Sequence, residues 1–269
     1  MQPTISENKN QFVFVFLVFA LSIPFWILGA TVELKDIIPI NLPISALMLL
    51  CPLTAAIILK QRETDHAAVK TLLKRVADFR QIKNRLWYIP MLLLIPATML
   101  FSYLIMKYVE MPLPEPDIQW RAAPVLFILF FIGAIAEEIG WTGYLTDPLQ
   151  KRFGALNTGF IIGSIWAIWH VVPYIQAHRS PNWILWQCIG TLALRIIFIW
   201  IYNNTGKSVF AVILCHTTVN LSEYLFPNYG SHYNPFIFAL LLIFITAVIT
   251  CFWSAKTLNE FRYQKPIKK

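Results

Sequence analysis

The sequence predicts an all-α fold: a polytopic membrane bundle of about eight transmembrane helices, forming one integral membrane domain over residues 1–269. Hydrophobic residues make up 57% of the chain and charged residues only 13%, whereas a soluble domain carries about 25% charged residues. Apolar stretches of about 20 residues, long enough to cross the hydrocarbon layer, recur along the chain. They are too long and too uniformly apolar for the alternating strands of a barrel, so helices are expected.

The expected spans follow one another along the whole chain. They lie near residues 12–31, 43–60, 86–107, 122–146, 156–177, 183–202, 208–226 and 235–254. Lysine and arginine, which favour cytoplasmic loops, gather after the second span, at Lys151 and Arg152, at Lys207 and in the C-terminal tail. This distribution predicts a multi-pass cell-membrane protein with both termini in the cytoplasm. Membrane lipids, and not nucleic acid, are then the partners of the net charge of +8.

The long basic loop contains a shorter helical pattern at about residues 64–85. Val69, Leu72, Leu73 and Val76 recur at helical spacing, while lysine and arginine occupy the other side. The pattern predicts an amphipathic cytoplasmic helix on the inner leaflet. A solvated connector helix fits it equally well.

A few ionisable residues fall inside the expected spans, where each costs several kcal/mol unless it faces the bundle interior. They are Glu137, Glu138, His170, Arg195, His216 and Glu223. A single histidine or carboxylate at such a depth is more often a structural hydrogen-bond partner than a catalyst. The combination of several carboxylates and histidines on neighbouring spans favours a functional site.

Helical geometry separates the roles of these residues. Adjacent residues on a helix point about 100° apart, so Glu137 and Glu138 face different partners. We therefore expect one to do chemistry while the other is structural. His216 and Asn220 are four residues apart and share one face of their helix.

The segment Glu137-Glu138-Ile-Gly-Trp-Thr142 resembles the first motif, Glu-Glu-x-x-x-Arg, of the CPBP family of intramembrane proteases. This family includes the CaaX prenyl endopeptidases and the bacteriocin-processing and Abi-like immunity proteins. Two further segments are similar to its later motifs, Trp166-Ala-Ile-Trp-His170 and His216-Thr-Thr-Val-Asn220. All three occur in the family's order within residues 137–220.

The resemblance implies an endopeptidase that hydrolyses a peptide bond in a membrane-associated or lipidated substrate. Glu137 and His170 would activate a water molecule, and His216 and Asn220 would stabilise the oxyanion. Trp166 and Glu138 would support these groups, and no cofactor would be required. Alternatively, Glu137, His170 and His216 would hold a divalent metal such as zinc. The chain has no His-Glu-x-x-His helix to fix the usual pair of histidine ligands.

Thr142 departs from the family pattern, which has arginine at this position. That arginine would lie one helical turn from Glu138 and neutralise it, so threonine leaves a buried carboxylate without its expected partner. We predict that Arg195, a costly charge in another span, reaches Glu138 instead. The departure also keeps a second hypothesis open, a non-catalytic immunity or scaffold protein of the same fold. A proton-coupled transporter ranks last, because the chain shows no repeated halves.

Overall fold

A computed structural model describes residues 5–31, 44–63, 66–227 and 230–263. Its helices are α1 (Ile5–Thr31), α2 (Cys51–Glu63), α3 (His66–Lys74), α4 (Tyr88–Tyr108), α5 (Ala123–Glu138), α6 (Asp147–Phe153), α7 (Ala155–Gln176), α8 (Pro181–Asn204), α9 (Val209–Leu225) and α10 (Pro235–Phe252). A 3-10 segment, Ile44–Leu50, leads into α2, and a π-helical segment, Ile139–Thr146, joins α5 to α6. These ranges contain no β-strand, only an isolated bridge between Trp253 and Phe261. The all-α prediction is confirmed.

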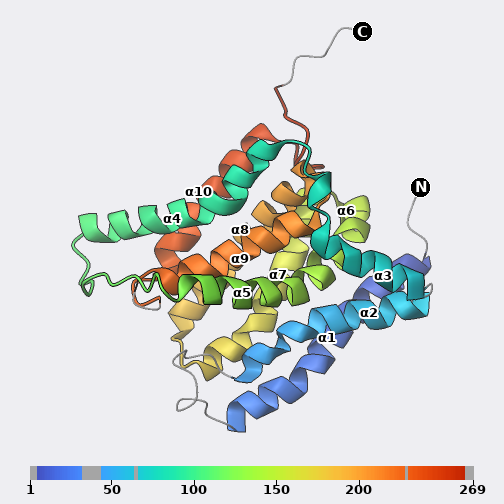
Figure 1. Cartoon of the computed structure of the whole chain (residues 1–269), viewed down its shortest axis with the longest axis horizontal. Helices are drawn as coiled ribbons and strands as arrows, with labels where there is room; N and C mark the ends of the chain where they lie inside the picture. The colour runs from blue at the N-terminus through green and yellow to red at the C-terminus, as the bar shows by residue number, and fades with distance from the viewer. Residues whose placement is uncertain (1–4, 32–43, 64–65, 228–229, 264–269) are drawn as a thin grey trace.

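The bundle is assembled around α8 and α9. Helix α8 packs along α7 and α10, while α9 packs against α4 and α5 (Figure 1). Helices α1 and α2 pair with each other, and α2 also contacts α5 and the π-helical segment. Every residue of α8 from Ala193 to Tyr202 is buried, as is most of α9. These two helices therefore provide the interior positions at which polar side chains avoid lipid.

Seven helical segments among the described residues are long and apolar enough to cross a membrane, and Val209–Leu225 is a shorter apolar helix. Each of the seven overlaps one of the other expected spans, although some end one or two residues earlier or begin one residue later. Helix α9 has 17 residues, and at about 1.5 Å per residue it is shorter than a hydrocarbon layer of about 30 Å. Its enclosure by neighbouring helices explains why it need not match the lipid thickness. Large exposed apolar side chains such as Phe101 and Phe244 give the outer helices a surface suited to lipid.

Two glycines bring α7 and α8 into close contact. A Cβ atom at Gly159 would lie 2.6 Å from Cγ1 of Ile196, and one at Gly163 would lie 3.0 Å from Cα of Leu192. Small residues four positions apart are a common device for packing helices in membranes. This contact fixes the distance between the helices that carry His170 and Arg195.

The α-helical part of the basic loop is shorter than the predicted 64–85, of which residues 64–65 lie outside the described part. Helix α3 ends at Lys74, and single 3-10 turns follow. Arg75 explains the break, because its guanidinium turns into the bundle. It donates to the carbonyl oxygens of Gly143 at 2.8 Å and Lys207 at 2.9 Å and to the Tyr202 hydroxyl at 2.6 Å.

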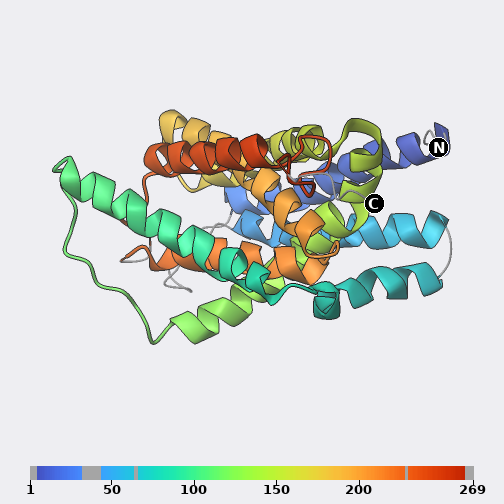
Figure 2. The same ribbon diagram turned by 90° about the horizontal axis from the view of Figure 1, so that it is seen from above.

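Helices α3 and α6 and the segment after α10 gather at one end of the bundle, where α1 begins (Figures 1 and 2). Lys70 and Lys74 belong to α3, Lys151 and Arg152 to α6, and Lys256 and Arg262 to the segment after α10. Lys207, between α8 and α9, pairs with Asp147 of α6. The lysines and arginines from which the cytoplasmic side was predicted thus lie at this end of the bundle. The assignment of this end to the cytoplasm stays a prediction.

Candidate active site

The two adjacent glutamates lie where α5 changes into the π-helical segment. Single π turns within α-helices are rare and often occur at functional sites. Gly140, in the first turn of this segment, has no room for a side chain, because a Cβ atom there would lie 2.6 Å from the carbonyl oxygen of Pro52. Helix α2 therefore presses directly on the backbone that follows Glu138. This contact holds the end of α5 in place.

Glu138 is fully buried and engaged by groups from three elements. Arg195 of α8 donates from Nη1 to Oε2 at 2.8 Å and from Nη2 to Oε1 at 3.2 Å. Thr142 donates its hydroxyl to Oε2 at 2.5 Å, and Nδ1 of His216 lies 2.9 Å from Oε1. The predicted contact between Arg195 and Glu138 is confirmed. With its oxygens occupied by these donors, Glu138 is suited to position other groups and poorly suited to attack a substrate.

Glu137 points to a different neighbour, as the helical geometry requires. The indole Nε1 of Trp166 donates to its Oε2 at 2.8 Å. Glu137 is 7% exposed, against 0% for Glu138. The two carboxylates of the motif thus have separate environments, one closed by a salt bridge and one with a single hydrogen bond from an indole.

The chemistry of their partners fixes the tautomers of both histidines. Nδ1 of His170 lies 2.9 Å from the carbonyl oxygen of Trp166, which can only accept, so Nδ1 carries the proton. Nδ1 of His216 contacts a Glu138 carboxylate that accepts from Arg195, so this Nδ1 is also a donor. In each neutral ring Nε2 is therefore the atom with a lone pair.

The indole of Trp166 is the shared wall of the site. His170 and His216 approach it edge to face, with ring centroids at 5.4 and 5.3 Å and interplanar angles of 84° and 81°. The guanidinium carbon of Arg195 lies 4.2 Å from the centroid of the same ring. Trp166 therefore links the two histidines, the arginine and Glu137 in one cluster.

Asn220 lies one turn after His216 on α9 and is half-buried. Within the part of the chain that the structure describes, no hydrogen bond involves its side-chain amide. An amide with both donors uncommitted suits a group that binds substrate. The sequence also did not single out Tyr174, which stacks on His170 with centroids 5.8 Å apart and an interplanar angle of 24°. Its position four residues after His170 was the available signal.

The predicted metal ligands do not form a metal site in this arrangement. Among residues 5–31, 44–63, 66–227 and 230–263, no three histidine, cysteine, aspartate or glutamate side chains lie close enough together to hold one ion. The Trp166 indole contacts both imidazoles and donates a hydrogen bond to Glu137. Glu137, His170 and His216 therefore do not fit a shared metal as placed here.

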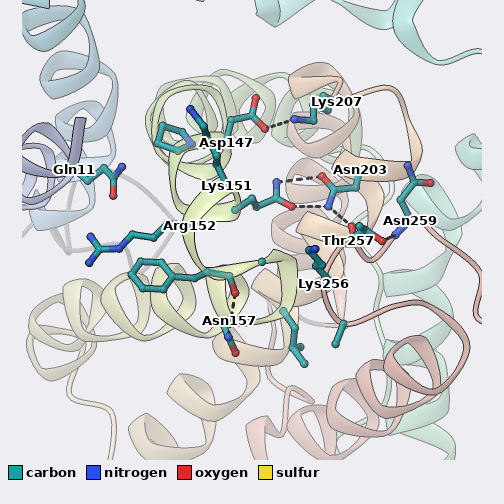
Figure 3. Close-up of a pocket in the computed structure, with 16 residues that line it drawn as sticks. Gln11, Asp147, Lys151, Arg152, Asn157, Asn203, Lys207, Lys256, Thr257 and Asn259 are labelled. Atoms are coloured by element: carbon teal, nitrogen blue, oxygen red, sulfur yellow. Dashed lines mark hydrogen bonds and ion pairs between the residues drawn. The ribbon is translucent and has the colours of Figure 1, made fainter. Parts of the chain in front are cut away.

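A cavity of about 1020 Å³ lies at the basic end of the bundle, between α6 and the segment after α10 (Figure 3). None of Glu137, His170, His216 and Asn220 lines it. It is thus separate from the cluster around Trp166.

Two comparisons with known proteins agree with the motifs. The family described as "Type II CAAX prenyl endopeptidase Rce1-like" matches residues 119–222. These residues run from just before α5 into α9 and include all the candidate site residues described above, from Glu137 to Asn220. The chain is also similar to a protein named "CAAX prenyl protease 2" from Methanococcus maripaludis. The two are 26% identical over 239 residues, covering 81% of this chain and 85% of the relative. The resemblance to this protease family, first read from three short motifs, is confirmed.

Proposed function

We propose that this chain is an intramembrane endopeptidase that hydrolyses a peptide bond in a membrane-associated, lipidated substrate. The family match over residues 119–222 supports the reaction class. The observation that carries the proposal is that the two adjacent glutamates have different hydrogen-bond partners. Glu138 is held by Arg195, Thr142 and His216, while Glu137 has one hydrogen bond, from the Trp166 indole, whose ring also packs against His170.

In the proposed reaction, Glu137 and Nε2 of His170 accept hydrogen bonds from one water molecule. Glu137 takes a proton from this water as its oxygen attacks the carbonyl carbon of the scissile peptide bond. The proton then passes to the leaving nitrogen when the carbon–nitrogen bond breaks. The hydrogen bond from Trp166 Nε1 to Oε2, at 2.8 Å, orients the carboxylate for this transfer.

Asn220 is the proposed oxyanion donor, because its amide has no other partner among the described residues. For His216 to donate as well, its ring must carry protons on both nitrogens, since Nδ1–H is directed to Glu138. The Glu138 carboxylate is then the counter-ion of the imidazolium. Glu138 and Arg195 act in this scheme as positioning residues for His216.

The chemistry of the substrate is proposed from the relative named "CAAX prenyl protease 2". A prenylated peptide ending in a CaaX-type sequence carries an apolar chain that partitions into the bilayer. A cleavage site enclosed by membrane helices would receive such a peptide from the membrane surface. The non-catalytic alternative rested on Thr142, and the contact of Arg195 with Glu138 offsets that departure.

One observation favours a metal-dependent variant of the same reaction. Metal-binding histidines usually direct their second ring nitrogen to a carbonyl or carboxylate group, as His170 and His216 do. A metal held by these residues and Glu137 would lower the pKa of bound water. Against this variant, the three side chains do not form a common ligand group in the structure.

The test is cleavage of a fluorogenic prenylated CaaX peptide by purified protein in detergent. We expect wild type to cleave it, and Glu137→Gln and His170→Ala to lose at least about 100-fold in kcat with unchanged thermal stability. Glu138→Gln is the matched control, because it changes the adjacent carboxylate and should lower thermal stability. Full activity of Glu137→Gln would overturn the assignment, and inhibition by a chelator, reversed by added zinc, would select the metal-dependent variant.

A further inference from the structure

The cavity at the basic end of the bundle is a second candidate site. It has a volume of about 1020 Å³. Figure 3 shows side chains from α6, the end of α8 and the segment after α10 around one hollow. The polar residues that matter for its chemistry are Gln150, Lys151, Arg152, Asn203, Lys207 and Lys256.

Hydrogen bonds between distant segments build the walls of this cavity. Asn203 of α8 and Gln150 of α6 exchange amide hydrogen bonds at 2.6 and 3.2 Å. Asn203 also donates to the carbonyl oxygen of Thr257 at 2.6 Å. The backbone N–H of Ala155 donates to the carbonyl oxygen of Lys256 at 2.8 Å. The segment after α10 is thereby attached to both α8 and the start of α7. The cavity is a structured feature and not a loose gap between loops.

The residues that line the cavity carry a net positive charge. Four cationic side chains line the cavity, against the single carboxylate of Asp147. That carboxylate is already engaged, by Nζ of Lys207 at 2.8 Å and by the Tyr202 hydroxyl at 3.0 Å. Lys151 and Lys256 are exposed. The excess of positive charge in a concave site selects an anionic ligand.

The position of the cavity relative to the membrane limits the class of anionic ligand further. Its lining comes from ends of the candidate spans and from the residues next to them: the starts of Asn10–Thr31 and Ala155–Gln176, the ends of Ala123–Phe153 and Pro181–Asn204, and the residues after Pro181–Asn204 and Pro235–Phe252. Helix ends of this kind lie at the level of the lipid headgroups. Phe153, at the rim, is 38% exposed and packs under the Arg152 guanidinium at 4.7 Å.

We propose that this cavity binds the headgroup of an anionic phospholipid, with Lys151, Arg152 and Lys256 facing its phosphate and acidic headgroup. Basic pockets between the ends of membrane helices on the cytoplasmic side are suited to such headgroups. The acyl chains would lie along the apolar helices adjoining the cavity. The proposal does not depend on the protease reaction, because no residue of the candidate active site lines the cavity.

The test measures phospholipid binding to the full-length protein after delipidation in detergent. Native mass spectrometry would count bound phosphatidylglycerol and phosphatidylcholine in wild type and in the Lys151→Gln/Lys256→Gln variant. We expect wild type to prefer phosphatidylglycerol, and the variant to bind it about tenfold more weakly with unchanged binding of phosphatidylcholine. Lys70→Gln/Lys74→Gln is the matched control, since it removes two exposed lysines from α3, outside the cavity.

Three results would overturn the proposal. The first is equal binding of phosphatidylglycerol to wild type and the cavity variant, and the second is an equal loss in the Lys70→Gln/Lys74→Gln control, which would indicate only general surface charge. The third is displacement of the lipid by millimolar inorganic phosphate, which would identify a soluble anion as the ligand. If the double variant is not monodisperse, Arg152→Gln provides the same comparison with one charge removed.

Discussion

Replacing Arg195 by leucine tests whether this residue takes over the role of the motif arginine that Thr142 lacks. Arg195 and Glu138 are 1% and 0% exposed, and the guanidinium donates two hydrogen bonds, at 2.8 and 3.2 Å, to the carboxylate. The substitution leaves a buried carboxylate with Thr142 and His216 as its remaining partners. Its cost therefore includes the loss of the charged partner of a buried carboxylate as well as the lost contacts.

Removal of one partner of a buried ion pair destabilises a protein by about 3–5 kcal/mol. At about 2–4 °C per kcal/mol for a chain of comparable size, we expect the apparent midpoint of thermal unfolding to fall by about 6–20 °C. Lys207→Leu is the matched control. Its pair with Asp147 has the same 2.8 Å separation, but the two side chains are 58% and 39% exposed. The expected loss for such a pair is about 0–1 kcal/mol.

A second variant moves the arginine to its position in the family motif. Thr142 lies one turn after Glu138 and already contacts Oε2 at 2.5 Å, so an arginine there is within reach of the same carboxylate. We expect Thr142→Arg to destabilise the wild-type chain, because two guanidinium groups would compete for one buried carboxylate. In the Arg195→Leu background it should instead restore at least about half of the lost stability, a coupling of opposite sign.

Thermal unfolding in detergent, followed by tryptophan fluorescence, and cleavage of the prenylated peptide would be measured on all four proteins and the control. The reasoning is refuted if Arg195→Leu loses no more stability than Lys207→Leu. It is also refuted if Thr142→Arg lowers stability equally in both backgrounds, since Arg195 and position 142 would then act on different groups.

Three further predictions concern the site and its support. Asn220→Ala should lower kcat by about 100- to 1000-fold, as expected for an oxyanion donor, with unchanged thermal stability because its amide has no partner in the described structure. Trp166→Phe should lower kcat by about 10- to 100-fold with KM unchanged, since it removes the 2.8 Å hydrogen bond to Glu137, a charged acceptor. Gly140→Ala should cost about 1–3 kcal/mol in thermal unfolding, because its Cβ would lie 2.6 Å from α2 backbone. Gly133→Ala, whose Cβ would meet nothing closer than 3.9 Å, is its control and should be neutral or stabilising.

The sequence predicted the helices well because hydropathy and length are properties of each segment alone. It did not predict that α9 would be enclosed by α4, α5 and α8, since an apolar segment looks the same whether its neighbours are lipid or protein. The predicted length of the helix in the basic loop was wrong for a related reason. A helical pattern over 64–85 does not reveal that Arg75 turns into the bundle to bind Gly143 and Tyr202 and ends the helix.

Within the site, the contacts that followed from charge were the ones predicted. A buried arginine needs a carboxylate, and Glu138 needed a cation, so their pairing across two helices could be inferred without a structure. Neutral donors give no such constraint. To predict the hydrogen bonds from Trp166 to Glu137 and from His216 to Glu138, one must know how α7 and α9 are rotated toward α5.

These rotations decide the roles of the histidines, which residue type alone left open. His170 and His216 are both imidazoles on membrane helices, yet one directs Nδ1 to a backbone carbonyl and the other to an ionised carboxylate. The carbonyl oxygen that accepts from Nδ1–H leaves the lone pair of a neutral His170 on Nε2, so this ring is suited to accept a hydrogen bond there. The carboxylate takes the Nδ1–H of His216, so in the proposed reaction only a proton on Nε2 would let this ring donate to an oxyanion. The different second partners of the two rings, and not their spacing in the motifs, therefore distinguish the histidine that orients the water beside Glu137 from the one that faces the oxyanion in the proposed reaction.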